Sequence, residues 1–271
     1  MSSYQDIIYS VADPVAVITL NRPDQLNAFN YQTLAEIRDA VERATADPSV
    51  VGVILTGAGR AFSAGLDMAV LAATTSADAP PAETAEDSLP GIFSYLLEVP
   101  KPVIAAVNGV AAGGGLILAL MSDLRFAAES AAFTTVFLKR GLIAEHGSSW
   151  LLPRMVGVSR ALDLLWMSDK IDAGQARDIG LVDRVCADDR LLEQATDYIR
   201  RLSKVSAPKA IAASKRLVYD HLGKGYADSL RDAERVQNDF VMASDSSEGA
   251  VAFMEKRLPR FDRVGNEEKK Q

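Results

Sequence analysis

One stretch of the chain, residues 101–120, restricts the possible folds more than any other. It begins with an apolar, β-branched run that is typical of a buried strand, and it turns at Asn108-Gly109. Three glycines, Gly113 to Gly115, then lead into a run rich in leucine and alanine. Glycines let a ligand approach the backbone, and the first N–H groups of a helix lack partners within it. The stretch therefore predicts a buried strand, a tight turn and a helix start that favours negative charge.

A second glycine turn, residues 57–67, has the same character. It follows an apolar run over residues 50–55. Two such turns predict two backbone donors that converge on one oxygen atom. Residues 103–121 approach the length of a transmembrane helix, but Asn108 and the glycines interrupt them, and no basic flank or second span accompanies them. A buried strand followed by a buried helix is the better interpretation.

Composition excludes several classes of protein. The chain has 271 residues, of which 48% are apolar, enough for a sizeable core, and its net charge of −7 gives no global attraction to nucleic acid or anionic membrane. A single cysteine, Cys186, excludes an internal disulfide and fits a reducing compartment. With only His146 and His221, no histidine-based metal cluster is available. We therefore expect no bound metal. The first residues show no secretory signal, so we expect a cytoplasmic protein.

Strands alternate with helices along most of the chain, which predicts an α/β core with parallel pairing. Residues 7–10 and 15–20 form a hairpin pattern, and Asn30 is placed to cap a helix that runs to residue 46. The pattern predicts an α/β core over residues 1–204 and a helical region over residues 205–271. Apolar residues at helical spacing mark the latter, namely Leu230, Ala233, Val236 and Phe240. The Pro- and Ala-rich residues 74–90 are expected to form a surface flap beside the ligand.

Several motifs spread along this chain make it resemble the crotonase family, that is, the enoyl-CoA hydratase/isomerase family. The resemblance implies a spiral of β-β-α units and a C-terminal helical region that mediates homo-trimers, often paired into hexamers. It implies no cofactor besides the coenzyme A of the substrate. The motifs are Leu26-Asn27-Ala28, residues 61–67 (AFSAGLD), residues 101–109 (KPVIAAVNG), the Gly113–Gly115 block, Ser122-Asp123-Leu124-Arg125 and Gly180-Leu181-Val182.

The resemblance also implies a substrate and a reaction intermediate. Family members bind acyl-CoA thioesters and stabilise a thioester enolate with two backbone N–H groups, which the motifs place at Ala64 and Gly114. Lys256 is expected to bind phosphate, from its own or a neighbouring subunit. The full set of expected substrate- and CoA-binding residues is Arg22, Ala28, Ser63, Ala64, Gly65, Leu66, Asp67, Gly114, Ile117, Phe137 and Lys256.

The sequence departs from the hydratase pattern at both catalytic acids. Hydratases of the family use two glutamates, and the matching positions here are Ile117 and Phe137, which transfer no proton. One acid remains, Glu145, in a loop that resembles that of the single-acid Δ3,Δ2-enoyl-CoA isomerases. One carboxylate suffices for a 1,3-proton shift because it acts first as base and then as acid. The sequence thus predicts Glu145 as proton shuttle in an isomerase of fatty-acid-type degradation.

Other functions stay open at this stage. One is an enoyl-CoA hydratase, forming 3-hydroxyacyl-CoA, with relocated acids. Others are thioester hydrolysis, C–C cleavage and a catalytically silent acyl-CoA-binding protein. An RNA-binding relative is set aside, because the helix expected over residues 31–46 carries only Arg38 and Arg43 and the chain is acidic. The length of the acyl chain is not readable from the pattern.

Overall fold

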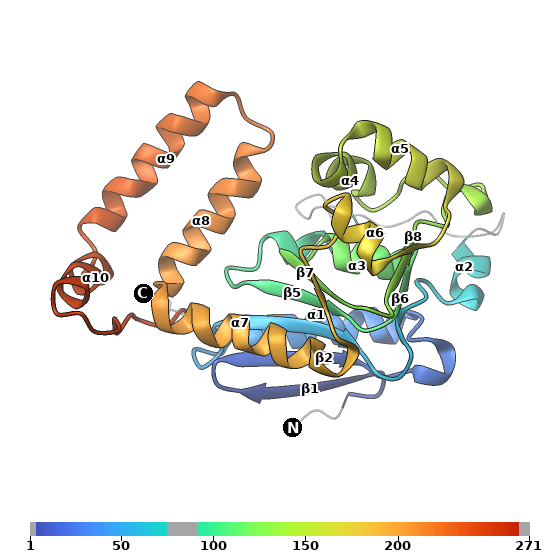
Figure 1. The fold of residues 1–271 in the computed structure, drawn as a ribbon, viewed down its shortest axis with the longest axis horizontal. Helices are drawn as coiled ribbons and strands as arrows, with labels where there is room; N and C mark the ends of the chain where they lie inside the picture. The colour runs from blue at the N-terminus through green and yellow to red at the C-terminus, as the bar shows by residue number, and fades with distance from the viewer. Residues whose placement is uncertain (1–3, 75–90, 266–271) are drawn as a thin grey trace.

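The computed structural model describes residues 4–74 and 91–265 and has the expected α/β class (Figure 1). The predicted flap, residues 74–90, lies outside the described residues except for its first position. The described strands form two sheets, ordered β1-β2-β3-β5-β7-β10 and β4-β6-β8-β9. The strands are β1 (Ile7–Ala12), β2 (Val15–Leu20), β3 (Gly52–Gly57), β4 (Ala61–Ser63), β5 (Val103–Val107), β6 (Val110–Ala112), β7 (Leu124–Ala128), β8 (Ala132–Thr134), β9 (Ile171–Asp172) and β10 (Arg184–Cys186).

Parallel pairing dominates both sheets. The exceptions are the predicted hairpin of β1 with β2 and the short contact of β8 with β9. The sequence of residues 180–185 predicts one more strand, but the structure has a strand only from Arg184 onward. Before it, the N–H groups of Leu181 and Val182 both donate to the carbonyl of Ala176, and Gly180 has a φ of +83°. These residues therefore form a turn, and β10 begins only after it.

Helices cover the sheets and fill the space between them. The N-cap predicted for α1 is confirmed, since the Asn30 side chain accepts the N–H of Thr33 at 2.7 Å. Helix α7 packs on β2, β3, β5 and β7. The helices of the core are α1 (Tyr31–Ala46), α2 (Met68–Thr74), α3 (Gly114–Leu120), α4 (Ser148–Val156), α5 (Val158–Met167), α6 (Ala173–Asp178) and α7 (Leu191–Val205). Short 3-10 turns are η1 (Pro23–Gln25), η2 (Ser94–Leu97), η3 (Leu138–Arg140) and η4 (Asp188–Arg190).

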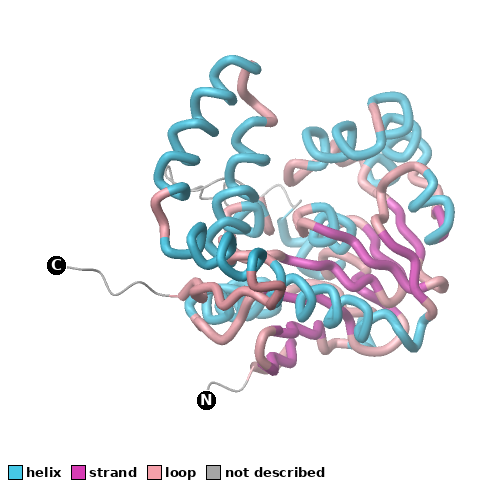
Figure 2. The backbone as a smooth tube through the Cα atoms, turned by 60° about the vertical axis from the view of Figure 1, so that its left-hand side comes forward, coloured by secondary structure: helices cyan, strands magenta, loops and turns pink. Residues whose placement is uncertain are grey.

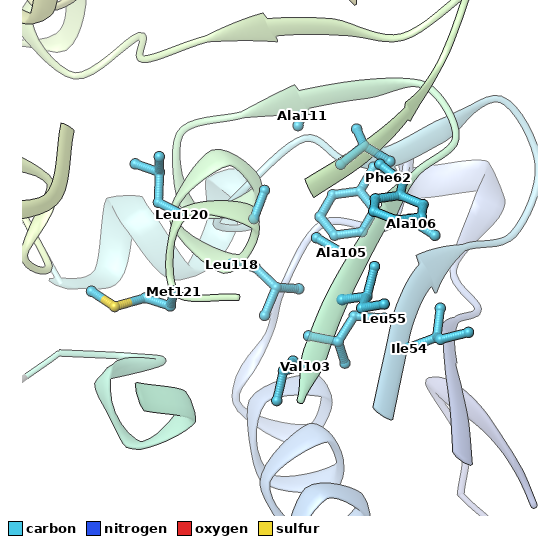
Figure 3. Close-up of a cluster of buried hydrophobic side chains, with 14 of the residues drawn as sticks. Ile54, Leu55, Phe62, Val103, Ala105, Ala106, Ala111, Leu118, Leu120 and Met121 are labelled. Atoms are coloured by element: carbon cyan, nitrogen blue, oxygen red, sulfur yellow. The ribbon is translucent and has the colours of Figure 1, made fainter. Parts of the chain in front are cut away.

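Helix α3 lies at the centre of the core. All seven of its residues are buried, and it packs against β4, β5, β6 and α4. Leu118 of this helix lies near Val103 of β5, and Phe62 of β4 near Ala106 (Figure 3). The apolar stretch of residues 103–121, which approaches the length of a transmembrane helix, is thus a buried strand, a turn and a buried helix. No helix within the described ranges is long and apolar enough to cross a bilayer.

Three further helices stand beside this core: α8 (Pro208–His221), α9 (Tyr226–Val241) and α10 (Ser244–Met254). Helices α8 and α9 form a hairpin set off from the sheets (Figures 1 and 2). Lys215 attaches α8 to the core, because its Nζ donates to Asp123 at 2.7 Å and to the Lys101 carbonyl at 3.2 Å. Several large apolar side chains on the helices are exposed, including Phe253 at 85%.

Candidate active site

The first helical residue of α3 supplies one unpaired backbone donor. The chain enters the helix through Gly113, whose φ of +51° suits glycine, and the Gly113 N–H is used by the Thr134 carbonyl at 3.1 Å. The next N–H, that of Gly114, has no acceptor within residues 4–74 and 91–265. A helix start with a free N–H favours a developing negative charge. Gly114 is therefore placed as the sequence predicts for one oxyanion donor.

The second donor belongs to Leu66. Phe29 forms a parallel bridge with Leu66, in which the Phe29 N–H donates to Gly65 and the Phe29 carbonyl accepts from Asp67. In such a bridge the N–H of Leu66 itself points away from Phe29 and has no acceptor in the described part of the chain. A Cβ placed on Gly114 would lie 3.5 Å from the Leu66 nitrogen. The amides of Leu66 and Gly114 thus lie next to each other.

The prediction of Ala64 as the second donor is wrong. The Ala64 N–H donates to the carbonyl of Leu26 at 2.9 Å, so it is already used within the fold. Gly65, between Ala64 and Leu66, has a φ of +91°, so the chain turns there and the two amides do not share one direction. The Ala64 N–H meets the Leu26 carbonyl before α1, whereas the Leu66 nitrogen lies beside Gly114. The motif locates the turn correctly but not which of its amides is free.

Close packing makes glycine necessary at two positions around these amides. A Cβ on Gly65 would lie 2.7 Å from the Ala112 carbonyl and 2.9 Å from the Gly114 nitrogen, and Gly65 has a φ of +91°. A Cβ on Gly115 would lie 2.3 Å from the Ser63 carbonyl. Real Cβ atoms do not approach backbone so closely. The glycines therefore bring the two turns together, which explains the paired pattern in the sequence.

Three of the expected binding residues are used to shape this turn. The Ser63 hydroxyl is fully buried, donates to the Asn27 carbonyl and accepts the Gly65 N–H at 3.1 Å, so it does not face a ligand. Arg22 donates to the Ala28 carbonyl at 2.5 Å and approaches Asp67 at 3.4 Å. The other Asp67 oxygen accepts the N–H of Ala69 at the start of α2. Arg22 and Asp67 thus position the segment that carries Leu66.

Apolar side chains surround the start of α3. Ile117, one turn into the helix, is fully buried, and Phe137 is 5% exposed. The Phe137 ring lies 4.0 Å from the Cβ position of Gly113, next to the free amide of Gly114. Val136 packs on the same glycine with a φ of +52°, which is unusual for a β-branched residue. The two positions at which the resemblance places the glutamates of hydratases are therefore buried apolar residues here.

The loop of residues 141–147 carries the candidate acid along the side of α3. It begins against Phe137, whose carbonyl accepts the Leu142 N–H at 3.1 Å. It ends at Gly147, where a Cβ would lie 2.7 Å from the Met121 side chain just beyond the far end of α3. Glu145 belongs to this loop, and its carbonyl accepts two bonds from Ser148 at the start of α4. The structure brings the acid-bearing loop and the two amides to the same helix.

Among the residues that the structure describes, the ion-pair partner of Glu145 is the adjacent His146. Nε2 of His146 lies 3.6 Å from a Glu145 carboxylate oxygen, and the two side chains are 33% and 31% exposed. Burial lowers the pKa of His146, and the nearby carboxylate opposes that effect only partly. Near pH 7 the imidazole is therefore neutral.

Lys256 lies far from this site. It follows α10, at the opposite end of the molecule from α2 and the turn that leads into it (Figure 1). A phosphate held by the Leu66 turn is out of reach of Lys256 in the same chain, so that form of the prediction is wrong. Its contribution from a neighbouring subunit stays a prediction. Within the described ranges, no three His, Cys, Asp or Glu side chains gather to hold a metal ion.

Comparison with known proteins agrees with this geometry. The family model described as enoyl-CoA hydratase/isomerase matches residues 11–264. A probable enoyl-CoA hydratase of Mycobacterium leprae is 36% identical over 258 residues, covering 95% of this chain and 98% of that protein. The 1,2-epoxyphenylacetyl-CoA isomerase of Escherichia coli K12 is 35% identical over 257 residues, covering 94% and 97%.

Solved structures agree as well. A putative enoyl-CoA hydratase from Streptomyces coelicolor A3(2) superposes with a TM-score of 0.86 at 32% identity, covering 97% of this chain and 96% of that one. A structure from Geobacillus kaustophilus titled as an enoyl-CoA hydratase subunit has a TM-score of 0.85 at 32% identity, covering 96% and 99%. The fold, the paired amides and these matches together show that the chain belongs to the enoyl-CoA hydratase/isomerase family, the crotonases.

Proposed function

We propose that this enzyme isomerises Δ3-enoyl-CoA thioesters to their Δ2 isomers. One observation carries the proposal: Glu145 is an acid on the loop beside α3, whereas Ile117 and Phe137 are buried apolar groups at the two positions of the hydratase acids. Hydration needs an activated water and a proton for carbon, hence two acid-base groups in this family. A proton shift needs one.

In the proposed reaction the amides of Leu66 and Gly114 donate to the thioester oxygen. Glu145 removes a proton from C2, and the electrons of that C–H bond move toward the thioester as a conjugated enolate. The same carboxyl group returns the proton to C4, so that the double bond moves from C3–C4 to C2–C3 with no net gain or loss of atoms. Two backbone donors aimed at the enolate oxygen stabilise it, and each is worth about 10²–10³ in rate in other enzymes.

The relatives support the substrate class. Both are named for reactions of CoA thioesters, one a hydratase and one an isomerase. The segment of residues 64–67 then holds the CoA adenine through backbone groups, as the resemblance implies. Lys256 reaches a phosphate only from another copy, which fits assembly into trimers or hexamers through the exposed apolar side chains of the C-terminal helices. We place the enzyme in the cytoplasm.

The test compares trans-3-enoyl-CoA and trans-2-enoyl-CoA as substrates of wild type and Glu145→Gln. We expect the first to be isomerised, and the variant to lose at least about 10³-fold in kcat, because the amide keeps the size of the acid but takes no proton. Circular dichroism and the unfolding midpoint should not change, since the Glu145 side chain is partly exposed. Glu129→Gln, on the exposed end that follows β7, is the matched control and should retain full activity.

Two outcomes contradict the proposal. Rapid formation of 3-hydroxyacyl-CoA from the trans-2 substrate would indicate a hydratase that uses another acid. Tight binding of CoA thioesters without turnover of any acyl chain would indicate a silent binding protein.

A further inference from the structure

Glu145 and His146 present their side chains to each other although they are consecutive residues. In an extended chain, successive side chains point to opposite faces. Here His146 has a φ of +50°, in the left-handed region, and its Nε2 lies 3.6 Å from the Glu145 carboxylate. Gly91 lies beside this point, since a Cβ there would be in ordinary contact with the His146 Cα at 3.6 Å. The loop thus holds an acid and an imidazole side by side.

We infer that His146 passes the proton carried by Glu145 to and from water, so that the proton delivered to C4 exchanges with solvent. This inference rests on the proposed isomerisation. After Glu145 takes the C2 proton, its carboxylic acid gives that proton to Nε2 of His146, which becomes an imidazolium, and the imidazolium loses a proton to water. The reverse steps return a solvent proton to Glu145 and then to C4. His146 is thus a positioning and relay residue and does not touch the substrate.

Two properties of the pair support the relay. A small side-chain rotation brings atoms 3.6 Å apart into hydrogen-bond range, and both groups are about one-third exposed, so that water reaches the imidazole. Burial lowers the pKa of His146, so the free imidazole is neutral near pH 7 and has a nitrogen able to accept the proton. His221, the other histidine, lies on α8, where its Nε2 is 3.5 Å from a carboxylate oxygen of Asp232.

The experiment runs the isomerisation of trans-3-enoyl-CoA in D₂O and measures deuterium at C4 of the product by NMR at low conversion. His146→Asn is the test variant, because asparagine adopts the left-handed conformation well and does not titrate. We expect wild type to incorporate deuterium and the variant to incorporate at least about threefold less, with kcat/KM lowered by less than about tenfold. Imidazole added to the buffer should restore incorporation in the variant.

His221→Asn is the matched control and should incorporate deuterium as wild type does. Equal incorporation by wild type and His146→Asn overturns the inference alone. A His146→Asn variant with normal deuterium incorporation and a changed rate also overturns the inference, because that result indicates only a structural role for His146. If wild type does not isomerise the substrate at all, the proposed function itself fails, so the two failures are distinguishable.

Discussion

The two halves of the site are held in place by different means. The amide half is fixed by packing so close that a single methyl group at Gly65 or Gly115 would overlap backbone atoms. The acid half is a loop in which Gly141 faces open space and Glu145 and His146 are partly exposed. In the proposed mechanism, oxyanion stabilisation therefore depends on the fold, whereas proton transfer depends on side chains that contribute little to stability. Substitutions should separate the two.

The largest effect is expected for Gly115→Ala. The new Cβ would lie 2.3 Å from the Ser63 carbonyl and 2.9 Å from its carbonyl carbon, so α3 and β4 must move apart. Overpacking of this kind costs about 1–3 kcal/mol. We expect a loss at the upper end of that range, about 3 kcal/mol, because both atoms belong to the backbone. Urea unfolding measures it.

The control for this change is Gly223→Ala in the turn between α8 and α9, where a Cβ meets nothing within 4 Å. Its unfolding free energy should stay within about 0.5 kcal/mol of wild type. If the two variants unfold at the same urea concentration, the amide half is not held by close packing.

The neighbouring substitution, Gly114→Ala, should leave the stability unchanged but lower the activity. Its Cβ would meet Gly65, Leu66 and Phe29 at 3.5 Å, which is ordinary contact, and alanine favours the first turn of a helix. We expect unchanged or slightly raised stability. The methyl group would, however, crowd the space between the two free amides, and kcat/KM should fall by about 10²-fold or more. A fully active Gly114→Ala variant would contradict the assignment of this oxygen-binding site.

The contrast between the amide half and the acid half also explains which features can be predicted from the sequence. Buried strands, glycine turns and the capped helix α1 follow from local patterns, and so does the pairing of two glycine turns. The identity of the second donor does not follow from them. The Ala64 N–H is used because Leu26, far away along the chain, accepts it, whereas the Leu66 N–H has no acceptor in the described part of the chain. The motif leaves both amides as candidates, and only tertiary pairing decides between them.

The attachment of the C-terminal helices does not follow from local patterns either. The carboxylate of Asp123 accepts the Val103 N–H, the Lys215 ammonium and the Tyr219 hydroxyl. Burial lowers the pKa of Lys215, and Asp123 opposes that effect. Such a contact between residues distant in sequence has no local pattern. The proposed role of Glu145, by contrast, is predicted from the motif that surrounds it.

The smallest expected effect is the pH dependence of stability that His146 introduces in the acid half. Burial lowers the pKa of the folded imidazole below its ordinary value near 6.5, so the unfolded chain binds more protons at a pH just below that value. Unfolding free energy should therefore rise with pH up to about 6.5 and gain nothing from this group above it. The rise should be below about 1 kcal/mol, because water screens a partly exposed pair.

The difference in unfolding free energy between wild type and His146→Asn isolates this effect, since the carboxylates common to both proteins cancel. Urea unfolding at pH 5 to 8 should show wild type less stable than the variant at the acid end, by an amount that declines to a constant above pH 7. A difference that grows in favour of wild type as the pH falls would mean that Glu145 stabilises an imidazolium more than burial opposes it. His146 would then be charged, not neutral, in the resting site, and it could not accept a proton from Glu145.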